Sequence, residues 1–560
     1  MKRRELLKTF PALAVVAFEE SQRLHAAGIS GRGSEERCSG RAVARPTPQQ
    51  IAWQNLELGM FIHFAPNTWQ NREYDDLSTP LSSIDPKELN TDQWADTAVS
   101  LGARYVVFVA KHAGGFCMWQ TKTTDYGIAK TPWKGGKGDV VAEIAASCHR
   151  RGLKFGIYCS PTDRHFGAGI GGRCKTPDMQ ARYNVIYREQ LTELFTRYGE
   201  LIEIWFDGST VTPVADLIHR YQPNAMVFQG PAATIRWVGN EDGYAPYPCW
   251  NGIDASLARL GTATALDGDP NGSVWLPNEV DVSIRRPDWF WSTTNASLVL
   301  TPDQLLSIYY RSVGRGAQLL LNIPPNREGL MDGKDCRSAE AFGEEIRRRF
   351  GTPLAATRGS GRTIRLDFRQ PQSIDTVILE EDTGLGERVR AFRLEGRIHG
   401  AWIAIGRGTA IGHKRIQPVE RRVIDAVRLR VREAAAPPRI RTFAVFDTGQ
   451  QPPADWDEAA ELWAPNLAGR WSGGKFSLGL GKSITAAAQY SLTFIPAAGK
   501  VQGFDHVSLL IGGVASPEFI HASRTKMDEL LLDITALNPS IIVSGTVLGA
   551  ERGEITLDRR

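Results

Sequence analysis

The sequence predicts an α/β fold, a (β/α) barrel of the TIM type, followed by a C-terminal β-sandwich and a further small β-rich domain. From about 45 to 350, short continuous apolar segments alternate with segments of helical periodicity, which is the pattern of a parallel sheet covered by helices. From 355 to 447, hydrophobic and polar residues alternate with period two, which indicates antiparallel strands. A chain of 560 residues has room for about three domains at roughly 100–200 residues each.

The barrel is predicted from its strands and from the helices between them. The segment Thr301-Pro302 has the composition of a helix start, with a capping hydroxyl followed by proline in the first turn. A doubly wound open sheet is the alternative, but no glycine-rich nucleotide-binding motif follows the first strand, so we favour the barrel. The expected strands are Arg104–His112, Leu153–Cys159, Ile202–Phe206, Ala225–Phe228 and Ala317–Asn322, and the expected helices cover 92–101, 140–151 and 184–198.

Four parts of the chain are expected in all. Residues 1–27 resemble a twin-arginine export signal, because paired arginines precede an apolar segment that is shorter than the roughly 20 residues needed to span a bilayer. Residues 45–350 form the predicted barrel and 355–447 the predicted β-sandwich. A proline-containing linker then leads to 455–560, a small β-rich domain whose role the sequence does not indicate. We therefore expect an exported protein, periplasmic or extracellular, that is not inserted in a membrane.

Composition excludes some classes of function. The formal net charge is +4, and lysine and arginine are spread along the chain, so no concentrated basic face for nucleic acid is expected. The seven cysteines include no CxxC pair, and no His/Cys spacing resembles a zinc site. The scattered cysteines indicate no disulfide framework, although one or two disulfides stay possible. Fifteen tryptophans provide flat aromatic faces of the kind that line sugar-binding clefts.

One carboxylate stands out by its position. Asp207 follows the buried segment Ile202–Phe206, and the carboxyl ends of barrel strands are where active sites are built. Glycoside hydrolysis needs two carboxyl groups that flank one bond. The alternative is that Asp207 caps the next helix.

Several motifs occur in consistent order over about 50–350: Gly59–Phe64, Lys111-His112 with Gly115–Trp119, Trp205–Gly208, Arg236–Glu241, Asp281–Arg285 with Trp289–Trp291, and Leu321–Asn326. Together they resemble glycoside hydrolase family 29, the α-L-fucosidases. The last three motifs resemble the branch that includes plant fucosidases and bacterial α-1,3/1,4-fucosidases.

The resemblance implies a role for each matching residue. Asp207 matches the nucleophile and Glu241 the acid/base, with Glu279 as the second candidate for the acid. A retaining enzyme holds these two carboxyl groups about 5–5.5 Å apart. Substrate-binding positions are expected at His63, Glu73, Tyr74, His112, Trp119, Tyr158, Trp205, Arg236 and Trp289, and Trp291 is expected either in the pocket wall or in the core.

The chain also departs from the family pattern. Where the family has Lys-His-His-Asp-Gly-Phe, this sequence has Ala113-Gly114 in place of the second histidine and the aspartate, and Thr162 replaces a tryptophan of plant relatives. The resemblance implies a retaining exo-α-L-fucosidase that hydrolyses terminal α-1,3/1,4-linked fucosyl residues from glycans, without metal or cofactor. A different 6-deoxy or galacto-configured sugar is the first alternative, and a carbohydrate-binding protein without catalysis is the second. The sandwich resembles a galactose-binding-like module, with a structural spacer as the alternative.

Overall fold

The computed structural model describes residues 43–259, 261–453, 467–480, 484, 487–496, 500–523, 527–536, 538 and 540–559. The export signal predicted at 1–27 lies outside the described residues, as does part of the small domain predicted at 455–560. Among the described residues, no helix is both long and apolar enough to cross a membrane. Six cysteines are free within this part of the chain: Cys117, Cys148, Cys159, Cys174, Cys249 and Cys336.

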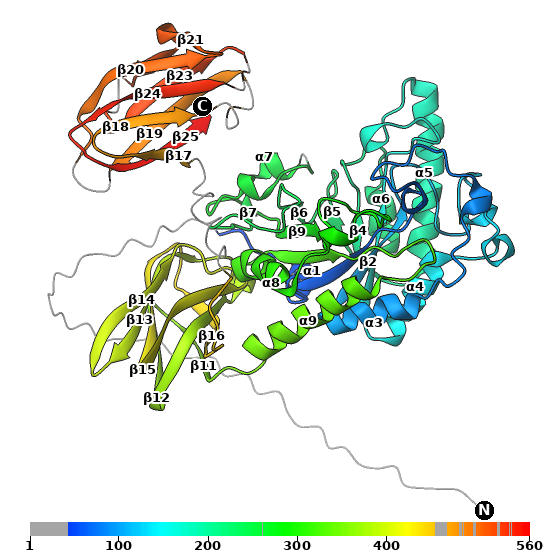
Figure 1. The fold of residues 1–560 in the computed structure, drawn as a ribbon, viewed down its shortest axis with the longest axis horizontal. Helices are drawn as coiled ribbons and strands as arrows, with labels where there is room; N and C mark the ends of the chain where they lie inside the picture. The colour runs from blue at the N-terminus through cyan, green and yellow to red at the C-terminus, as the bar shows by residue number, and fades with distance from the viewer. Residues whose placement is uncertain are drawn as a thin grey trace, which may run out of the picture. The chain divides into compact units, whose positions relative to one another are not determined.

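Eight parallel strands form the barrel, in the spatial order β5-β4-β3-β2-β1-β10-β9-β6 (Figure 1). A parallel bridge between Phe228 and Ile235 joins the two ends of this order and nearly closes the barrel. Every residue of β1, β2 and β10 is buried, as expected for strands covered on both faces. The predicted fold class is therefore confirmed. The strands are β1 Leu58–Ile62, β2 Tyr105–Lys111, β3 Lys154–Cys159, β4 Leu201–Trp205, β5 Met226–Phe228, β6 Arg236–Trp237, β9 Asn278–Ser283 and β10 Gln318–Asn322.

Helices surround the barrel, and α4, α3, α9 and α8 pack side by side in that order. The predicted start at Thr301 is confirmed, because its hydroxyl accepts a hydrogen bond from the Gln304 N–H and the Gln304 side chain returns one to the Thr301 N–H. The helix after β3 begins at Pro177, earlier than expected, because Thr176 caps it. The helices are α1 Pro48–Gln54, α2 Asn67–Gln70, α3 Thr91–Leu101, α4 Val140–Arg150, α5 Pro177–Arg197, α6 Ala215–Tyr221, α7 Ala255–Ala258, α8 Pro302–Arg311 and α9 Gly333–Phe350.

The barrel departs from a regular strand–helix alternation after β5. No helix separates β5 from β6, which are joined by residues 229–235. A long excursion then separates β6 from β9 and contains α7 and the antiparallel pair β7 Gly252–Ile253 and β8 Val274–Trp275. The first part of this excursion carries Glu241, so an irregular segment supplies one of the predicted catalytic residues.

The region after the barrel is an antiparallel sheet of six strands in the order β11-β16-β12-β15-β13-β14. The two long strands β12 and β15 shift register between Asp367 and Gln372, and apolar side chains of the sheet form their own buried core. A sugar-binding function of the six-stranded sheet stays a prediction. The strands are β11 Ala355–Ser360, β12 Thr363–Glu381, β13 Val389–Ile398, β14 Ala401–Gly408, β15 Arg415–Ala434 and β16 Arg439–Phe446.

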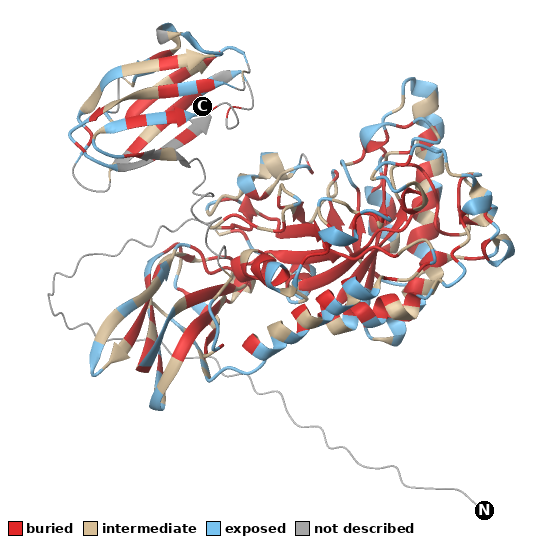
Figure 2. Cartoon of the chain, in the orientation of Figure 1, coloured by how far each residue is buried: buried red, intermediate tan, exposed pale blue. Residues whose placement is uncertain are grey.

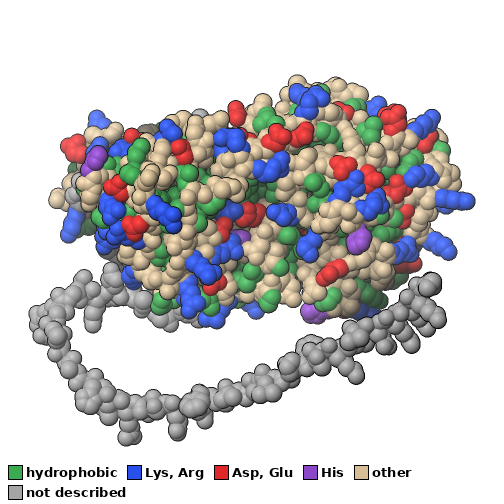
Figure 3. Space-filling model, turned by 90° about the horizontal axis from the view of Figure 1, so that it is seen from below, with side chains coloured by type: hydrophobic (Ala, Val, Ile, Leu, Met, Phe, Trp, Pro, Cys, Tyr) green, Lys and Arg blue, Asp and Glu red, His purple; other side chains and the backbone are tan. Residues whose placement is uncertain are grey.

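Some side chains of this six-stranded sheet belong to the core of the barrel. Ile378, Ile416, Ala444 and Phe446 are buried in the same hydrophobic cluster as the barrel strands. Polar contacts add to this packing, since Lys414 pairs with Glu57 of the barrel. Figure 2 shows the barrel strands buried and the outer faces of the helices exposed. On the face in Figure 3, basic and acidic side chains are interspersed.

The C-terminal domain consists of two antiparallel sheets with their own hydrophobic core, which includes Trp471, Leu492 and Val543. One sheet has the order β17-β25-β19-β23-β22 and the other β18-β24-β20-β21. The strands are β17 Leu467–Trp471, β18 Lys475–Gly479, β19 Ala488–Pro496, β20 Gly503–Ile511, β21 Val514–Ala515, β22 Ile520–Ala522, β23 Glu529–Ile534, β24 Ile541–Leu548 and β25 Gly553–Arg559.

Candidate active site

A cavity of about 220 Å³ lies at the carboxyl ends of the barrel strands. Several of its side chains directly follow or end a strand: His63 follows β1, His112 follows β2, and Asp207 comes two residues after β4. Because the strands are parallel, the residues that end or follow them lie at the same end of the barrel, where barrel enzymes build their active sites. The cavity is lined by Phe61, His63, Glu73, Tyr74, His112, Tyr158, Trp205, Asp207, Glu241, Asp281, Pro287 and Trp289.

Asp207 presents its carboxylate to the cavity. Its Oδ2 accepts a hydrogen bond of 2.9 Å from the Tyr158 hydroxyl. Desolvation by the surrounding protein raises the pKa of Asp207, and the Tyr158 hydrogen bond opposes this rise because it favours the carboxylate. Burial also raises the pKa of Tyr158 well above its usual value, so the phenol keeps its proton and stays a donor. Tyr158 thus orients the Asp207 carboxylate.

Trp289 connects Glu241 to the rest of the site. Its indole Nε1 donates to Glu241 Oε2 at 3.1 Å, and its backbone N–H donates to Glu73 Oε2 at 2.9 Å. The Trp289 carbonyl accepts a hydrogen bond from Asn322 Nδ2 at 2.8 Å. Burial raises the pKa of Glu73 to about 7. One tryptophan, held at both backbone polar atoms, therefore positions the Glu241 side chain.

The two histidines of the cavity are neutral at ordinary pH. Burial lowers the pKa of His63 well below its usual value and that of His112 to about 4. His63 Nδ1 lies 2.9 Å from Asn322 Oδ1, an acceptor, so Nδ1 carries the proton and Nε2 is left as an acceptor. The Nδ1 atom of His112 is buried without a protein hydrogen-bond partner among the described residues.

The fourth carboxyl group of the cavity, Asp281 of β9, was given no role from the sequence. It is 5% exposed, and its Oδ1 accepts a hydrogen bond of 2.6 Å from the Trp237 indole. Burial, and then the nearby charge of Glu241, raise the pKa of Asp281 well above its usual value. The signal available in the sequence was its position within the Asp281–Arg285 motif.

Comparison with known proteins shows the family of this chain. Residues 67–348 match the α-L-fucosidase family. The chain is 33% identical over 473 residues to a putative α-L-fucosidase 1 of Oryza sativa subsp. japonica, covering 76% of this chain and 89% of that protein. It belongs to the α-L-fucosidases, glycoside hydrolase family 29.

Solved structures of other α-L-fucosidases have the same fold. A putative α-L-fucosidase from Bacteroides thetaiotaomicron matches with a TM-score of 0.68 and 31% identity, over 72% of this chain and 99% of that one. A family 29 fucosidase from Ruminococcus gnavus, in complex with fucose, matches with a TM-score of 0.64 and 25% identity, over 74% and 97% of the two chains.

Two predicted substrate-binding residues of this fucosidase, Trp119 and Arg236, do not line the cavity. Trp119 is fully buried, and its indole donates to Glu193 Oε2 at 2.8 Å. Arg236 donates to Asn278 Oδ1 and to the Trp250 carbonyl, so its guanidinium faces the β6–β9 excursion. The expectation that these two side chains bind substrate is not met. Trp291, which was left open, donates to Asp332 and is also absent from the lining.

Glu279 lies beneath the cavity, inside the barrel. It is fully buried, and its Oε2 accepts a hydrogen bond of 3.0 Å from the Trp205 indole, which also donates to Glu203. Tyr105 donates to Glu279 Oε1 at 3.0 Å. Burial and the neighbouring Glu203 raise the pKa of Glu279 well above its usual value. Trp205 separates it from the substrate space, so the structure places this second candidate acid in a supporting position.

The departure at Gly114 has a structural counterpart in Asp75. A Cβ atom at position 114 would lie 2.1 Å from Asp75 Oδ2. Asp75 is 2% exposed and accepts hydrogen bonds from Tyr126 Oη, Gln70 Nε2 and Leu77 N at 2.7–2.8 Å. A buried carboxylate from the β1 loop therefore fills the space that a side chain at 114 would need.

Among the described residues, no three His, Cys, Asp or Glu side chains are grouped so that they could hold a metal ion.

Proposed function

We propose that this α-L-fucosidase is a retaining exo-enzyme that removes terminal α-1,3- or α-1,4-linked fucose, with Asp207 as nucleophile and Glu241 as acid/base. One observation supports the assignment most strongly. All four carboxyl groups line the cavity, but only Asp207 and Glu241 are exposed residues. Glu73 is engaged by the backbone N–H groups of Trp289 and Phe290, and Asp281 is buried.

The proposed reaction has two steps. A carboxylate oxygen of Asp207 attacks the anomeric carbon, the bond to the leaving oxygen breaks, and that oxygen takes its electron pair and the proton of Glu241. Glu241, now a carboxylate, then removes a proton from water, whose oxygen attacks the anomeric carbon and releases Asp207. Tyr158 keeps the nucleophile oriented in both steps through its hydrogen bond.

The cavity supports an exo mode of action on one sugar residue. Its volume of about 220 Å³ is below the roughly 300–1,000 Å³ of pockets that hold drug-sized ligands. His63 Nε2 and the buried His112 Nδ1 offer polar atoms to sugar hydroxyls, and Trp205 and Trp289 offer aromatic faces. We also infer export of the enzyme, which a fusion of residues 1–27 to a reporter protein would test by its release from the cytoplasm.

The test uses an aryl α-L-fucoside with Asp207→Ala, Glu241→Ala and Glu279→Ala. Loss of the nucleophile should lower kcat by roughly 10³-fold or more. Azide should restore turnover of the aryl substrate in Glu241→Ala, because this anion attacks the anomeric carbon of the glycosyl-enzyme without needing a general base and releases Asp207 as the glycosyl azide forms, but it should not do so in Glu279→Ala. The first fucose released should be the α anomer by NMR. Release of the β anomer, or rescue of Glu279→Ala alone, would contradict the assignment.

The Ala113-Gly114 departure favours a second candidate on the same machinery, another 6-deoxy or galacto-configured glycone. A panel of aryl glycosides decides between them by kcat/KM. Preferential release of a sugar other than fucose would replace the glycone and leave the two carboxyl roles in place. Glycan binding without hydrolysis of any substrate in the panel would instead favour the non-catalytic alternative.

A further inference from the structure

One face of the six-stranded sheet gathers arginine side chains that are scattered along the sequence. Residues that lie directly opposite each other in an antiparallel pair point to the same face of a sheet. Rows of such residues cross the start of β12, the end of β15, β13 and β14. The apolar residues between these rows, such as Leu394 and Leu429, belong to the buried core on the other face. We call this surface the arginine face, and its arginines are Arg365, Arg393, Arg397, Arg407, Arg428 and Arg430.

Three of these arginines stand side by side on neighbouring strands. Arg393 of β13 lies directly opposite Arg430 of β15 on one side and Arg407 of β14 on the other. Neighbouring strands lie about 4.8 Å apart, so the row spans roughly 10 Å. Like charges directly opposite each other destabilise a sheet, and local arrangements that oppose folding are typical of functional sites. An anion that bridges the row would relieve this repulsion.

The arginine face has more cations than carboxylates. Its ion pairs use three carboxylates, which are Asp367, Glu395 and Asp425. Arg407 and Arg430 form no ion pair within the part of the chain that the structure describes. Because six guanidinium groups share three carboxylates, the face has a net charge of +3.

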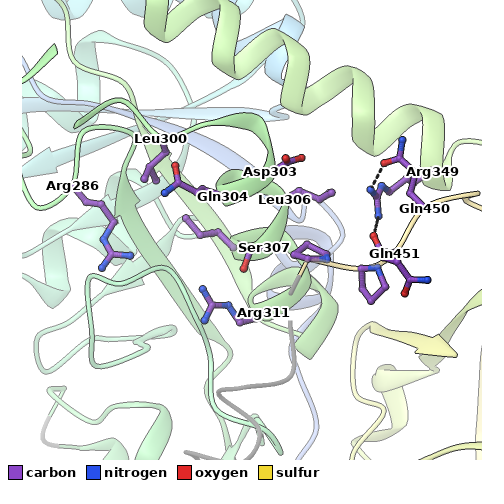
Figure 4. Close-up of a pocket in the computed structure, with 13 residues that line it drawn as sticks. Arg286, Leu300, Asp303, Gln304, Leu306, Ser307, Arg311, Arg349, Gln450 and Gln451 are labelled. Atoms are coloured by element: carbon purple, nitrogen blue, oxygen red, sulfur yellow. Dashed lines mark hydrogen bonds between the residues drawn. The ribbon is translucent and has the colours of Figure 1, made fainter. Parts of the chain in front are cut away.

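A second surface lined by arginines differs in this respect. It is a depression along α8, shown in Figure 4, in which Arg349 donates to Gln450 Oε1 at 2.8 Å. Arg349 also pairs with Glu345, and Arg286 of the same depression pairs with Asp242. An anion would have to displace these carboxylates, whereas it would find two unpaired guanidinium groups on the arginine face. Of the two surfaces, the arginine face is therefore the better anion site.

Trp402 of β14 orders guanidinium groups of the arginine face. The guanidinium carbons of Arg428, Arg365 and Arg397 lie 4.2, 5.4 and 5.8 Å from the centre of its ring, within the range of cation–π attraction. A side chain that is ordered before binding loses less entropy when the ligand binds. Guanidinium groups donate two parallel hydrogen bonds to carboxylate and phosphate groups, and sulfate presents the same tetrahedral oxygens as phosphate. The face is thus pre-organised for such anions.

We propose that the arginine face binds an acidic polysaccharide, whose carboxylate or sulfate groups contact Arg393, Arg407 and Arg430. Successive strands offer cations about 4.8 Å apart, so charged groups on neighbouring sugars of one chain can be bound together. Duplex nucleic acid carries one charge per about 1.7 Å of its axis, and the three carboxylates of the face would repel so dense a charge. The sheet thereby holds this α-L-fucosidase on a charged glycan. This binding requires neither Asp207 nor Glu241, so the inference does not rest on the proposed mechanism.

The test measures binding of the full chain to immobilised polygalacturonate, dextran sulfate and neutral dextran by biolayer interferometry. At least one acidic polymer should bind at low salt and neutral dextran should not, and the tighter acidic polymer identifies carboxylate or sulfate as the preferred group. In the double variant Arg407→Gln/Arg430→Gln the affinity should fall about tenfold or more. The slope of log affinity against log salt concentration should decrease by roughly two, one for each lost contact.

The matched control is the double variant Arg182→Gln/Arg337→Gln. It removes two exposed arginines of α5 and α9 that form no ion pair among the described residues, so it loses the same charge. This control should bind the acidic polymer as the unaltered protein does. Because Arg407 and Arg430 each lie opposite a like charge, their substitution should leave Tm unchanged or raise it. Weaker binding at an undiminished Tm cannot come from unfolding.

A further variant should act in the opposite direction. Asp367→Asn removes the carboxylate that pairs with Arg365 and Arg397, so it should strengthen binding of the acidic polymer. Equal affinities of the Arg407→Gln/Arg430→Gln variant and its control, or no binding of either acidic polymer, would overturn the proposal. Tighter binding of a duplex oligonucleotide than of both acidic polymers at the same salt would overturn the choice of a polysaccharide. Hydrolysis of the aryl fucoside reports separately on the proposed function, since these variants should leave it unchanged.

Discussion

Single residues of this site perform several tasks at once, and Trp289 is the clearest case. Its indole contacts Glu241, its N–H contacts Glu73, and its carbonyl contacts Asn322, which also holds His63. Substitution of one such residue affects the acid/base, a cavity carboxyl and a histidine together. Contacts of this kind are not additive, and only double-mutant cycles separate them.

Gly114→Ala tests the contact between position 114 and Asp75. The new Cβ would lie 2.1 Å from Asp75 Oδ2, and three hydrogen-bond donors prevent Asp75 from moving away. Overpacking of this kind costs about 1–3 kcal/mol, so the free energy of unfolding should fall by that amount in urea denaturation. Gly479→Ala is the control, because an added Cβ there meets nothing within 4 Å. Equal effects of the two substitutions would show that the contact with Asp75 is not restrictive.

The lowered pKa of His112 predicts how the stability of the protein depends on pH. The pKa of His112 is about 4 in the folded protein, lowered first by burial and then by Arg164, against about 6.5 when unfolded. The unfolded chain therefore takes up a proton first as pH falls. The contribution of His112 to stability is complete above about pH 6.5 and is lost progressively as pH falls towards 4.

Thermal unfolding at pH 7.5, 6 and 5 measures this dependence. The loss of Tm between pH 7.5 and 5 should be smaller in His112→Asn than in the unaltered protein. His399→Asn, at an exposed histidine, should leave the pH dependence as it is. A parallel shift of the whole curve in His112→Asn would mean that this histidine does not titrate differently on folding.

At the scale of secondary structure, the six-stranded sheet supports the excursion between β6 and β9. Glu387 is 3% exposed, and its carboxylate accepts hydrogen bonds from Asn251 N at 3.0 Å and Asn251 Nδ2 at 2.7 Å. Arg236, at the start of the same excursion, adds favourable charge near Glu387. The segment that carries Glu241 is thus anchored from outside the barrel.

Glu387→Ala should therefore destabilise the enzyme by about 1–3 kcal/mol, because it leaves buried donors of Asn251 without an acceptor. The midpoint of thermal unfolding measures the effect. Glu420→Ala is the matched control, since Glu420 is exposed and pairs with the exposed Arg422, and exposed pairs contribute about 0–1 kcal/mol. A loss no larger than that of the control would rule out an anchoring function for Glu387.

The sequence predicted those elements whose signal is local. Strands β2, β3 and β10 were predicted because they are continuous apolar segments, and the start of α8 because capping is encoded within four residues. The two-residue β6 has no such signal, since it exists only through pairing with β9.

The direction of a side chain was harder to predict than its position along the chain. Asp207 was predicted at the site because it directly follows a buried strand. Trp119 and Arg236 were misplaced because their partners, Glu193 and Asn278, are distant in sequence. Asp281 was given no role because β9 is buried throughout, so burial does not distinguish the residue that faces the cavity, and its place in the Asp281–Arg285 motif was the only signal.

At the scale of the whole molecule, the C-terminal domain has only its own hydrophobic core, whereas the six-stranded sheet has its own core and also contributes side chains to the core of the barrel. The C-terminal hydrophobic cluster consists only of residues from 471 to 557 among those that the structure describes. The barrel cluster, in contrast, includes Ile378, Ile416, Ala444 and Phe446 of the six-stranded sheet. These cores predict different behaviour on truncation.

A fragment of 467–560 should fold alone and unfold cooperatively, while a chain that ends at 351 should aggregate because its barrel core loses those four side chains. A chain that ends at 453 should stay folded and hydrolyse the aryl fucoside. Size-exclusion chromatography and circular dichroism measure whether each of the three chains is soluble and folded. An activity assay with the aryl fucoside tests the chain that ends at 453. A soluble, folded chain ending at 351 would show that the shared cluster is dispensable.

The exclusion between Gly114 and Asp75 also constrains how the site can change over evolutionary time. A larger residue at 114 is tolerated only after the carboxylate at 75 has been lost, and that loss by itself leaves the Tyr126 hydroxyl without its acceptor. Substitution of either residue alone is therefore disfavoured, whereas substitution of both residues together causes no steric clash. Single-site libraries would score these positions as intolerant, and only paired libraries can reach the alternative pocket.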